Sequence, residues 1–386
     1  MRLTTLITTL LTHISLASAD YVSDFALQKV LSDSAEVFGY YEPSSSSSSS
    51  RAEWMKSISD STPITQLNIP GTHDAATWNY SQTTQDSLSY ATRCDGVKPG
   101  IAKQYRCQTK SISQSLEAGI RFFDLRYAYD PVDAHLVFWH GAALLSAKAT
   151  VEDVLFGFYA WLSAHPSEFV ILSFQYEPFT KANATAGSLV QGELYRVLNT
   201  PAAKHYISQS RGVTGTLGEH RGKILLFRRF DLDELPREVE GSMPGLHMSP
   251  EKWWVNGKEF KLVYNESSNG TAFIEDYFYP WGHKTIEDNV EAKFAAVQSH
   301  LFKASTGPED GLFVTFTSGT HVGVDPPVYP ETMALGGDGD EGGVNLRLAG
   351  LLGRLQGARL GIVVLDFWEE PEDLVDLVLG WDLKEI

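Results

Sequence analysis

The stretch Leu67-Asn-Ile-Pro-Gly-Thr-His-Asp74 is a short apolar run that breaks at Pro70-Gly71 and then presents an imidazole beside a carboxylate. Such a break is typical of a strand end, because proline cannot donate to a β-ladder and glycine adopts the backbone angles of an exit turn. We therefore predict a strand over residues 65–69 and place His73 and Asp74 on the loop that follows it.

Apolar runs alternate with amphipathic segments along the rest of the chain. The predicted strands cover residues 120–126, 169–174, 223–229, 271–276, 312–316 and 361–366, and the predicted helices cover residues 112–119, 150–165, 188–198, 286–302 and 344–359. Strands that are apolar on both faces and alternate with helices are typical of a parallel sheet covered by helices. Seven or eight such units predict an α/β fold, a distorted TIM-type β/α barrel in a single catalytic domain.

Charged side chains gather where six apolar runs end: His73 with Asp74, Asp124 with Arg126, His140, Arg229, Asp276 and Asp366. Barrel enzymes build their sites from several strands at this end of the barrel. A single pair such as Asp124 and Arg126 could be a structural ion pair at the rim. Six strand ends of this kind favour an active site.

Two imidazoles, neighbouring carboxylates and one guanidinium can transfer a phosphoryl group without a metal ion. A neutral imidazole takes a proton from the attacking hydroxyl, an imidazolium protonates the leaving oxygen, and a guanidinium holds the phosphate oxygens. Carboxylates beside the histidines fix their tautomers and raise their pKa values. The remaining histidines, such as His165, His205 and His321, are assigned to structure or surface.

The composition excludes several classes of function. The chain has 386 residues, 43% of them apolar, and a formal net charge of −17. This charge argues against nucleic acid as a partner and against general attraction to anionic membranes. After the N-terminus no apolar segment reaches the roughly 20 residues that a membrane span needs. We expect a monomer with peripheral membrane contact only.

Residues 1–19 have the pattern of a secretory signal, with Arg2, an apolar run and the small residues Ala17-Ser-Ala19; a buried N-terminal helix is the alternative. We predict an N-terminal segment with a serine-rich linker over residues 20–51 and a catalytic barrel over residues 52–386. A secreted, extracellular glycoprotein fits the four Asn-x-Ser/Thr acceptors, at Asn79, Asn183, Asn265 and Asn269.

The chain has two cysteines, Cys94 and Cys107, in a polar region near His73. In an oxidising compartment a disulfide between them is expected, and two free thiols or a metal pair are the alternatives. The acidic loop over residues 336–343 lacks the spacing of a calcium loop, so we expect it to be solvated.

Aromatic residues are concentrated in two irregular stretches, Trp253-Trp254 and Phe278-Tyr-Pro-Trp281. Aromatic side chains suit a membrane interface, because one end is apolar and the other is polar. They equally suit a core beneath long loops.

Six stretches together resemble the secreted bacterial-type phosphatidylinositol-specific phospholipase C family: residues 68–74, 119–126, 138–141, 169–177, 221–229 and 363–368. The first three, in this order, are fairly specific, and the resemblance covers residues 57–381. It implies an enzyme that acts on a phospholipid at the membrane surface and releases diacylglycerol and inositol 1,2-cyclic phosphate.

The resemblance also implies a role for each residue that matches its motifs. His73 would be the general base on the inositol 2-hydroxyl, oriented by Asp366. His140 would be the general acid for the diacylglycerol oxygen, assisted by Asp74. Arg126 would bind the phosphate.

By the same resemblance Asp124 steadies the phosphate-binding region, and the headgroup contacts are Arg229, Asp276, Tyr277, Phe278 and Gln175. Calcium-dependent eukaryotic relatives have asparagine and further carboxylates where this chain has Asp74, Arg126 and Gln175. We therefore expect no metal or other cofactor. The family usually has a lysine near Gln175, which leaves a phosphodiesterase for another headgroup as one alternative. A secreted lipid-binding barrel that has lost turnover is the non-enzyme alternative.

Overall fold

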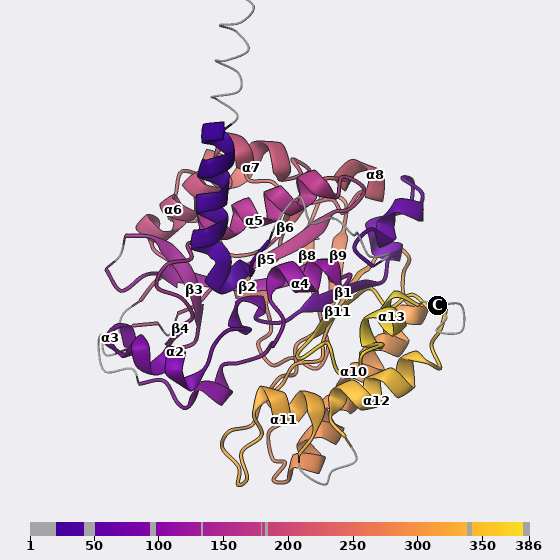
Figure 1. Ribbon diagram of the computed structural model, residues 1–386. Helices are drawn as coiled ribbons and strands as arrows, with labels where there is room; N and C mark the ends of the chain where they lie inside the picture. The colour runs from indigo at the N-terminus through magenta and orange to yellow at the C-terminus, as the bar shows by residue number, and fades with distance from the viewer. Residues whose placement is uncertain are drawn as a thin grey trace, which may run out of the picture.

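The structure, a computed structural model, describes residues 21–41, 51–92, 98–132, 134–178, 180–181, 184–337 and 342–380. Figure 1 shows strands gathered in the centre of the domain with helices around them. No helix within these ranges is both long and apolar enough to cross a membrane. Several sequence predictions fall outside the described residues: the signal peptide, the serine run, Cys94, Asn183, and Asp338, Asp340 and Glu341 of the acidic loop.

The described strands form one sheet that curves into a nearly closed barrel. In spatial order they are β7 (Leu246–His247), β6 (Ile224–Arg229), β5 (Val170–Tyr176), β2 (Phe122–Tyr129), β1 (Ile69–Thr72), β11 (Ile362–Leu365), β10 (Leu312–Phe316), β9 (Gly270–Glu275) and β8 (Phe260–Asn265). Neighbours from β7 to β9 are parallel, and β8 pairs antiparallel with β9 and lies beside β7. Outside this path, β3 (Leu136–His140) pairs antiparallel with β2 and with β4 (Ala143–Leu144).

Helices cover the outside of the sheet. One spans residues 21–38. The others are α2 (Gln82–Ser87), α3 (Ser89–Thr92), α4 (Ile112–Glu117), α5 (Val151–Ala164), α6 (Ser188–Leu198), α7 (Pro201–Tyr206), α8 (Leu217–His220), α9 (Arg237–Ser242), α10 (Ile286–Thr306), α11 (Pro330–Leu335), α12 (Val344–Leu352) and α13 (Leu374–Leu379). Figure 1 shows α10, α11 and α12 together on one side of the sheet. The predicted β/α barrel is confirmed.

Three details of the sequence prediction were wrong. Residues 64–66 form a 3-10 turn, and the first strand begins at Ile69 and contains Pro70. The proline fits there because its carbonyl still accepts a hydrogen bond from the backbone N–H of Arg121 at 2.9 Å. Strands β7 and β8 were not predicted, and α12 ends at Leu352, well before the expected Arg359.

The barrel interior changes from apolar to polar along six of its strands. Successive residues of a strand point to opposite faces, so every second residue faces inward. On six strands the inward series ends in a polar side chain: Ile69-Gly71-His73, Phe122-Asp124-Arg126, Ile171-Ser173-Gln175, Leu225-Phe227-Arg229, Ile274-Asp276 and Ile362-Val364-Asp366. The apolar members pack together as the inner core. The polar members therefore meet at the carboxyl end of the barrel.

Gly71 lets the first two strands approach closely. A Cβ atom at this position would lie 2.9 Å from Cβ of Phe122, closer than two such atoms pack. The glycine therefore holds the His73 end of β1 against β2, which carries Asp124 and Arg126.

The N-terminal helix packs on the barrel domain. Val37 and Phe38 are fully buried in the outer core cluster, and the Phe38 ring meets the Phe158 ring edge-on at 5.3 Å between centroids. Gly157 of α5 makes room for it, since a Cβ there would lie 2.6 Å from the Phe38 ring. The packed domain thus includes residues on the N-terminal side of the predicted boundary at residue 52.

Candidate active site

A cavity of about 330 Å³ opens at the carboxyl ends of the barrel strands. Most of the predicted site residues line it: His73, Arg126, His140, Gln175, Arg229, Asp276, Phe278 and Asp366. A larger cavity of about 650 Å³ adjoins it and shares Gln175, Arg229 and Val255. The smaller cavity is the candidate active site, because both histidines line it.

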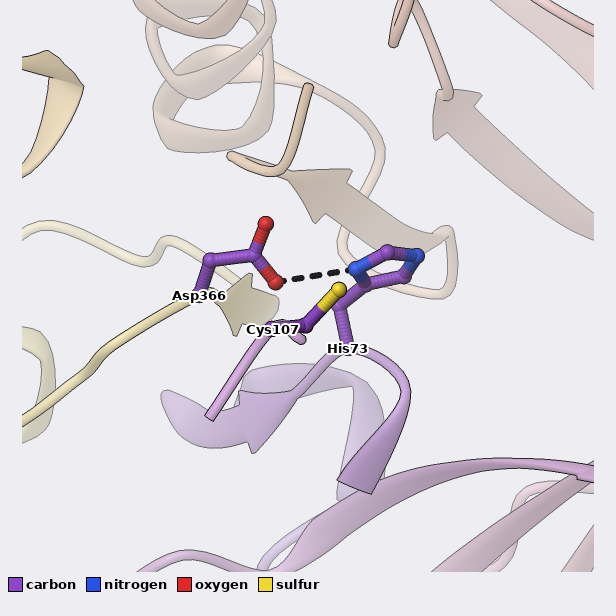
Figure 2. Close-up of side chains that lie close together, drawn as sticks. All are labelled: His73, Cys107 and Asp366. Atoms are coloured by element: carbon purple, nitrogen blue, oxygen red, sulfur yellow. Dashed lines mark hydrogen bonds and ion pairs between the residues drawn. The ribbon is translucent and has the colours of Figure 1, made fainter. Parts of the chain in front are cut away.

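His73 and Asp366 are paired at the ends of neighbouring strands. Nδ1 of His73 lies 2.9 Å from Oδ1 of Asp366, as Figure 2 shows. Gln108 holds the two strand ends together, because its Nε2 donates to the carbonyl oxygens of His73 and Leu365, each at 2.8 Å. The predicted pairing of His73 with the distant Asp366 is present in the structure.

The other ring nitrogen of His73 faces Arg126. Nη2 of Arg126 lies 2.9 Å from Nε2 of His73. A guanidinium can only donate, so this contact requires a lone pair on Nε2. The neutral tautomer with its proton on Nδ1 satisfies both Asp366 and Arg126. Nε2 is then the basic nitrogen of the ring.

The carboxylates around His73 control its protonation. Burial lowers the pKa of His73, but the negative charges of Asp366 and Asp74 outweigh it, and the pKa lies above its ordinary value. The predicted upward shift is confirmed for this histidine. The imidazolium that forms when His73 takes a proton is therefore stabilised.

His140 behaves differently. Its Nδ1 donates to the backbone carbonyl of Tyr105 at 2.8 Å, and its Nε2 lies 3.2 Å from Oδ2 of Asp74. Burial, together with the positive charges of Arg126 and His73, lowers the pKa of His140 to about 4. The predicted upward shift is wrong for His140, because burial and these charges outweigh the nearby carboxylates. At neutral pH His140 is an uncharged imidazole in the free protein.

Asp74 lies between the two histidines. Its Oδ2 is 3.2 Å from Nε2 of both His73 and His140, and its Oδ1 is 3.0 Å from Nε of Arg126. The residue has φ 41° and ψ 53°, the left-handed conformation that aspartate tolerates better than most residues. The sequence assigned Asp74 to His140, and the structure places it against both rings.

Arg126 is surrounded by three carboxylates. Its Nε lies 3.4 Å from Oδ2 of Asp124, its Nη1 lies 3.6 Å from Oε2 of Glu177, and Asp74 completes the set. Burial lowers the pKa of Arg126, but these carboxylates raise it above the ordinary value. Burial raises the pKa of Asp124, and the charges of Arg126 and Arg229 bring it below its ordinary value. A permanent cation thus stands among these side chains.

Arg229 and Asp276 are joined through Trp253. Cζ of Arg229 lies 3.8 Å from the centroid of the Trp253 ring, and Trp253 Nε1 donates to Oδ2 of Asp276 at 2.8 Å. Nη1 of Arg229 also lies 3.5 Å from Oδ1 of Asp124. These contacts fix the guanidinium and the carboxylate at one wall of the cavity.

Two of the three remaining predicted headgroup residues line the cavity, and one does not. Phe278 and Gln175 line the cavity, and Oε1 of Gln175 is buried without a hydrogen-bond partner among the described residues. Tyr277 is also buried, but it does not line the cavity, and Lys258 Nζ lies 4.5 Å from its ring centroid. The structure brings together all of the predicted catalytic and headgroup residues except Tyr277. Asp74 and Asp124 do not line the cavity themselves, but they contact the arginines and histidines that do.

Sequence reasoning missed three residues of the site, Gln108, Glu177 and Trp253, and named Cys107 only as half of a disulfide. Glu177 continues the inward series of β5 after Ser173 and Gln175, so the period of two could have found it. Cys107 and Gln108 come from an irregular loop, where no period exists. Cys107 is buried with a free thiol, and its predicted partner Cys94 lies outside the described residues, so the disulfide stays a prediction.

The fold and the site define a β/α barrel whose carboxyl end holds two histidines and a carboxylate-bound arginine. A family model described as "Phosphatidylinositol-specific phospholipase C, X domain" matches residues 94–230, which include Arg126 and His140 but not His73 or Asp366. The likeness to this family therefore rests on about a third of the chain.

Bacterial proteins and one solved structure extend the likeness beyond the matched residues. The 1-phosphatidylinositol phosphodiesterase of Staphylococcus aureus is 25% identical over 280 residues, 71% of this chain and 77% of that protein. The protein of the same name from Listeria monocytogenes is 25% identical over 321 residues, 82% of this chain and 81% of that protein. A structure of S. aureus phosphatidylinositol-specific phospholipase C has a TM-score of 0.63 at 23% identity, covering 86% of this chain and 98% of that one.

Proposed function

We propose that this protein is a metal-independent phosphatidylinositol-specific phospholipase C that releases diacylglycerol and inositol 1,2-cyclic phosphate. The observation that carries the proposal is the placement of two imidazole Nε2 atoms, each 3.2 Å from the same oxygen of Asp74, beside the Arg126 guanidinium. The bacterial relatives, named 1-phosphatidylinositol phosphodiesterases, support the substrate class.

In the first half of the reaction His73 acts as general base. Its Nε2 takes the proton of the inositol 2-hydroxyl, and the oxygen attacks phosphorus to form the cyclic ester. Asp366 holds the Nδ1 proton and stabilises the imidazolium that results. The raised pKa of His73 supports this role, because it makes Nε2 a stronger base.

In the second half His140 acts as general acid. The bond between phosphorus and the glycerol oxygen breaks, and Nε2 of His140 protonates that oxygen. A pKa of about 4 would leave His140 without this proton at neutral pH. A phosphodiester anion bound beside Arg126 offsets the positive charge that lowers this pKa, so we expect the substrate to raise it. Asp74 then keeps the protonated ring in place.

Arg126 supplies the positive charge for the phosphate. Its contacts with Asp74, Asp124 and Glu177 fix the planar group, and a fixed guanidinium binds phosphate oxygens through parallel hydrogen bonds. Carboxylates in this arrangement would suit a calcium ion, but the guanidinium stands among them. This supports catalysis without a metal ion.

The inositol ring would lie along the wall formed by Arg229 and Asp276. A guanidinium donates and a carboxylate accepts, so the pair suits the hydroxyls of a polyol. Phe278 offers an apolar surface to one face of the ring, and the free Oε1 of Gln175 accepts a further hydroxyl hydrogen bond.

Exposed aromatic and apolar residues near the cavity would contact the lipid surface. Trp254 and Trp281 are 63% and 70% exposed, and Val255, 65% exposed, lines both cavities. Trp253, in contrast, is buried in the barrel core. Trp253 thus fits the core interpretation of the tryptophan pair, and Trp254 fits the lipid interpretation. The membrane contact would be peripheral and made by a monomer.

Export and glycosylation belong to the same proposal. Asn79 and Asn269 are exposed and available for a glycan. Asn265 is less suitable, because its Nδ2 donates to the carbonyl of Gly212 and its Oδ1 accepts from Ser267. We propose an extracellular protein that is glycosylated at Asn79 and Asn269.

A panel of phospholipid vesicles tests the function. Neutral vesicles that contain phosphatidylinositol should release diacylglycerol, and vesicles of phosphatidylcholine or phosphatidylglycerol alone should not. The variants His73→Ala and His140→Ala should each lose about 10²–10⁴-fold in rate. Equal cleavage of another headgroup would overturn the assignment, and an unchanged rate in either variant would overturn the mechanism.

A further inference from the structure

Cys107 lies directly beside the His73–Asp366 pair. A ring nitrogen of His73, the thiol of Cys107 and a carboxylate oxygen of Asp366 all lie within 4.8 Å of one another. Figure 2 shows the sulfur directed toward the gap between the carboxylate and the ring. The same thiol also lies within 4.8 Å of a carboxylate oxygen of Asp74 and a ring nitrogen of His140.

The thiol is held in place by its own backbone. The N–H of Cys107 donates to Oγ1 of Thr77 at 3.0 Å, and its carbonyl accepts from the N–H of Phe367 at 3.0 Å. The thiol itself makes only a weak contact, 3.8 Å from the carbonyl of Tyr105. The proposed phosphodiester cleavage makes no use of this group.

Asp366 has one carboxylate oxygen that makes no hydrogen bond among the described residues. Its Oδ1 is bonded to His73, whereas its Oδ2 is buried and has no hydrogen-bond partner among the described residues. The side chain is 1% exposed. A buried carboxylate oxygen without a partner is costly, and a metal ion is one group that satisfies it.

We propose that Cys107, as the free thiol of the structure, forms with His73 and Asp366 an inhibitory site for a thiophilic divalent cation such as Zn²⁺. A disulfide between Cys94 and Cys107 would exclude this site. A thiolate, an imidazole and a carboxylate are three of the ligand types that zinc prefers, and a water molecule can complete a tetrahedron. Ligand atoms around tetrahedral zinc lie roughly 3.3–3.8 Å apart, so shifts of about 1 Å would close this set around an ion.

The ion would inhibit by replacing a proton. Bound to Nδ1 of His73, it displaces the proton that this nitrogen donates to Asp366, and the thiol loses its proton as well; both protons pass to solvent. His73 then loses its partner and its place in the reaction. This consequence rests on the proposed function, whereas the binding of the ion does not. Catalysis without a metal and inhibition by one are compatible.

Binding is tested without reference to activity. We would titrate the full chain, kept reduced with a phosphine, with Co²⁺ and follow the charge-transfer absorbance of a thiolate–cobalt bond, and measure Zn²⁺ binding by calorimetry. One ion should bind per chain. Cys107→Ala should abolish the absorbance band and weaken Zn²⁺ binding at least tenfold, and the matched control Cys94→Ala should behave as the wild type. Cys107→Ser, which keeps the size of the side chain, repeats the test if the alanine variant fails to fold.

Activity supplies the second arm. Zn²⁺ should inhibit the wild type and Cys94→Ala, a chelator should restore them, and Cys107→Ala should keep its activity at the same Zn²⁺ concentration. No Co²⁺ band in the wild type, or equal Zn²⁺ binding in Cys107→Ala, would overturn the proposal. If the band appears but no phospholipid is cleaved, the metal site stands and the proposed function fails.

Discussion

Nδ1 of His73 and Oδ1 of Asp366 lie 2.9 Å apart although 293 positions separate the two residues in the chain. The contact exists because β1 and β11 are neighbours in the barrel, in a register that pairs Thr72 with Leu365. His73 directly follows Thr72, and Asp366 directly follows Leu365, so the two functional side chains lie side by side. The first and last strands along the chain, β1 and β11, thus build the basic half of the site together.

The pH dependence of kcat should report this pair, because kcat reflects the complex in which we expect the bound phosphodiester to keep His140 protonated. His73 acts as a base only when it is deprotonated, and Asp366 and Asp74 raise its pKa against the effect of burial. Activity should therefore fall as the pH drops through a midpoint above the ordinary histidine value. Asp366→Asn removes the carboxylate that raises the pKa of His73 most, so the midpoint should move to lower pH and the rate should drop.

The control for this prediction is Asp376→Asn. Asp376 is a carboxylate of similar burial on α13, where it pairs with Arg51. It should affect stability and leave the midpoint unchanged. A midpoint in Asp366→Asn equal to that of the wild type would contradict the role of Asp366.

Arg126→Lys should lower kcat by about a hundredfold to a thousandfold. Lysine keeps the charge but not the planar fork, which contacts His73, Asp74 and Glu177 at once. The matched control is Arg196→Lys, on the exposed surface of α6, where no change is expected. Steady-state kinetics on a soluble phosphodiester measures the effect apart from membrane binding. A rate within threefold of the wild type would show that catalysis does not need the planar guanidinium of Arg126.

The double variant Trp254→Ala with Trp281→Ala should lose affinity for neutral vesicles and keep its rate on a soluble substrate. Both side chains are exposed, and aromatic rings contribute to binding at the lipid interface. Phe302→Ala is the control: Phe302 is 48% exposed near the end of α10, at the opposite end of the barrel. Vesicle sedimentation measures binding. An equal loss of vesicle affinity in the double variant and in Phe302→Ala would show that Trp254 and Trp281 have no special role in membrane binding.

Phe38→Ala should lower the free energy of unfolding by about 3–5 kcal/mol, because it leaves a cavity against Phe158 and Gly157. Phe25→Ala, at a 63% exposed position of the same helix, should change stability by less than about 0.5 kcal/mol. Urea denaturation gives both values. Similar values for the two variants would mean that the helix over residues 21–38 does not stabilise the barrel domain.

The inward series of the strands explains how much of the site the sequence could predict. His73, Asp124, Arg126, Arg229 and Asp366 follow apolar residues at a spacing of two, and this period is readable without coordinates. Glu177 obeys the same rule and was overlooked. The predicted helices over residues 112–119 and 150–165 likewise begin within one residue of α4 and α5, whose first turns carry capping boxes at Ser111 and Thr150.

Long-range packing explains what the sequence could not predict. The loop that carries Cys107 and Gln108 has no period, and only the fold brings it beneath His73. The low pKa of His140 depends on burial and on Arg126, both of them set by the folded structure. The strand β8 has only two buried residues, so it lacks the continuous apolar run by which other strands were predicted.

The central claim is that His73 and His140 cleave phosphatidylinositol by internal attack of the 2-hydroxyl, without a metal ion. Phosphorus NMR of the water-soluble product, formed from phosphatidylinositol vesicles in excess chelator, tests it most directly. We expect a cyclic phosphodiester resonance as the first product, formed at a rate that the chelator does not reduce. A phosphomonoester formed first, or a reaction stopped by the chelator, would contradict it.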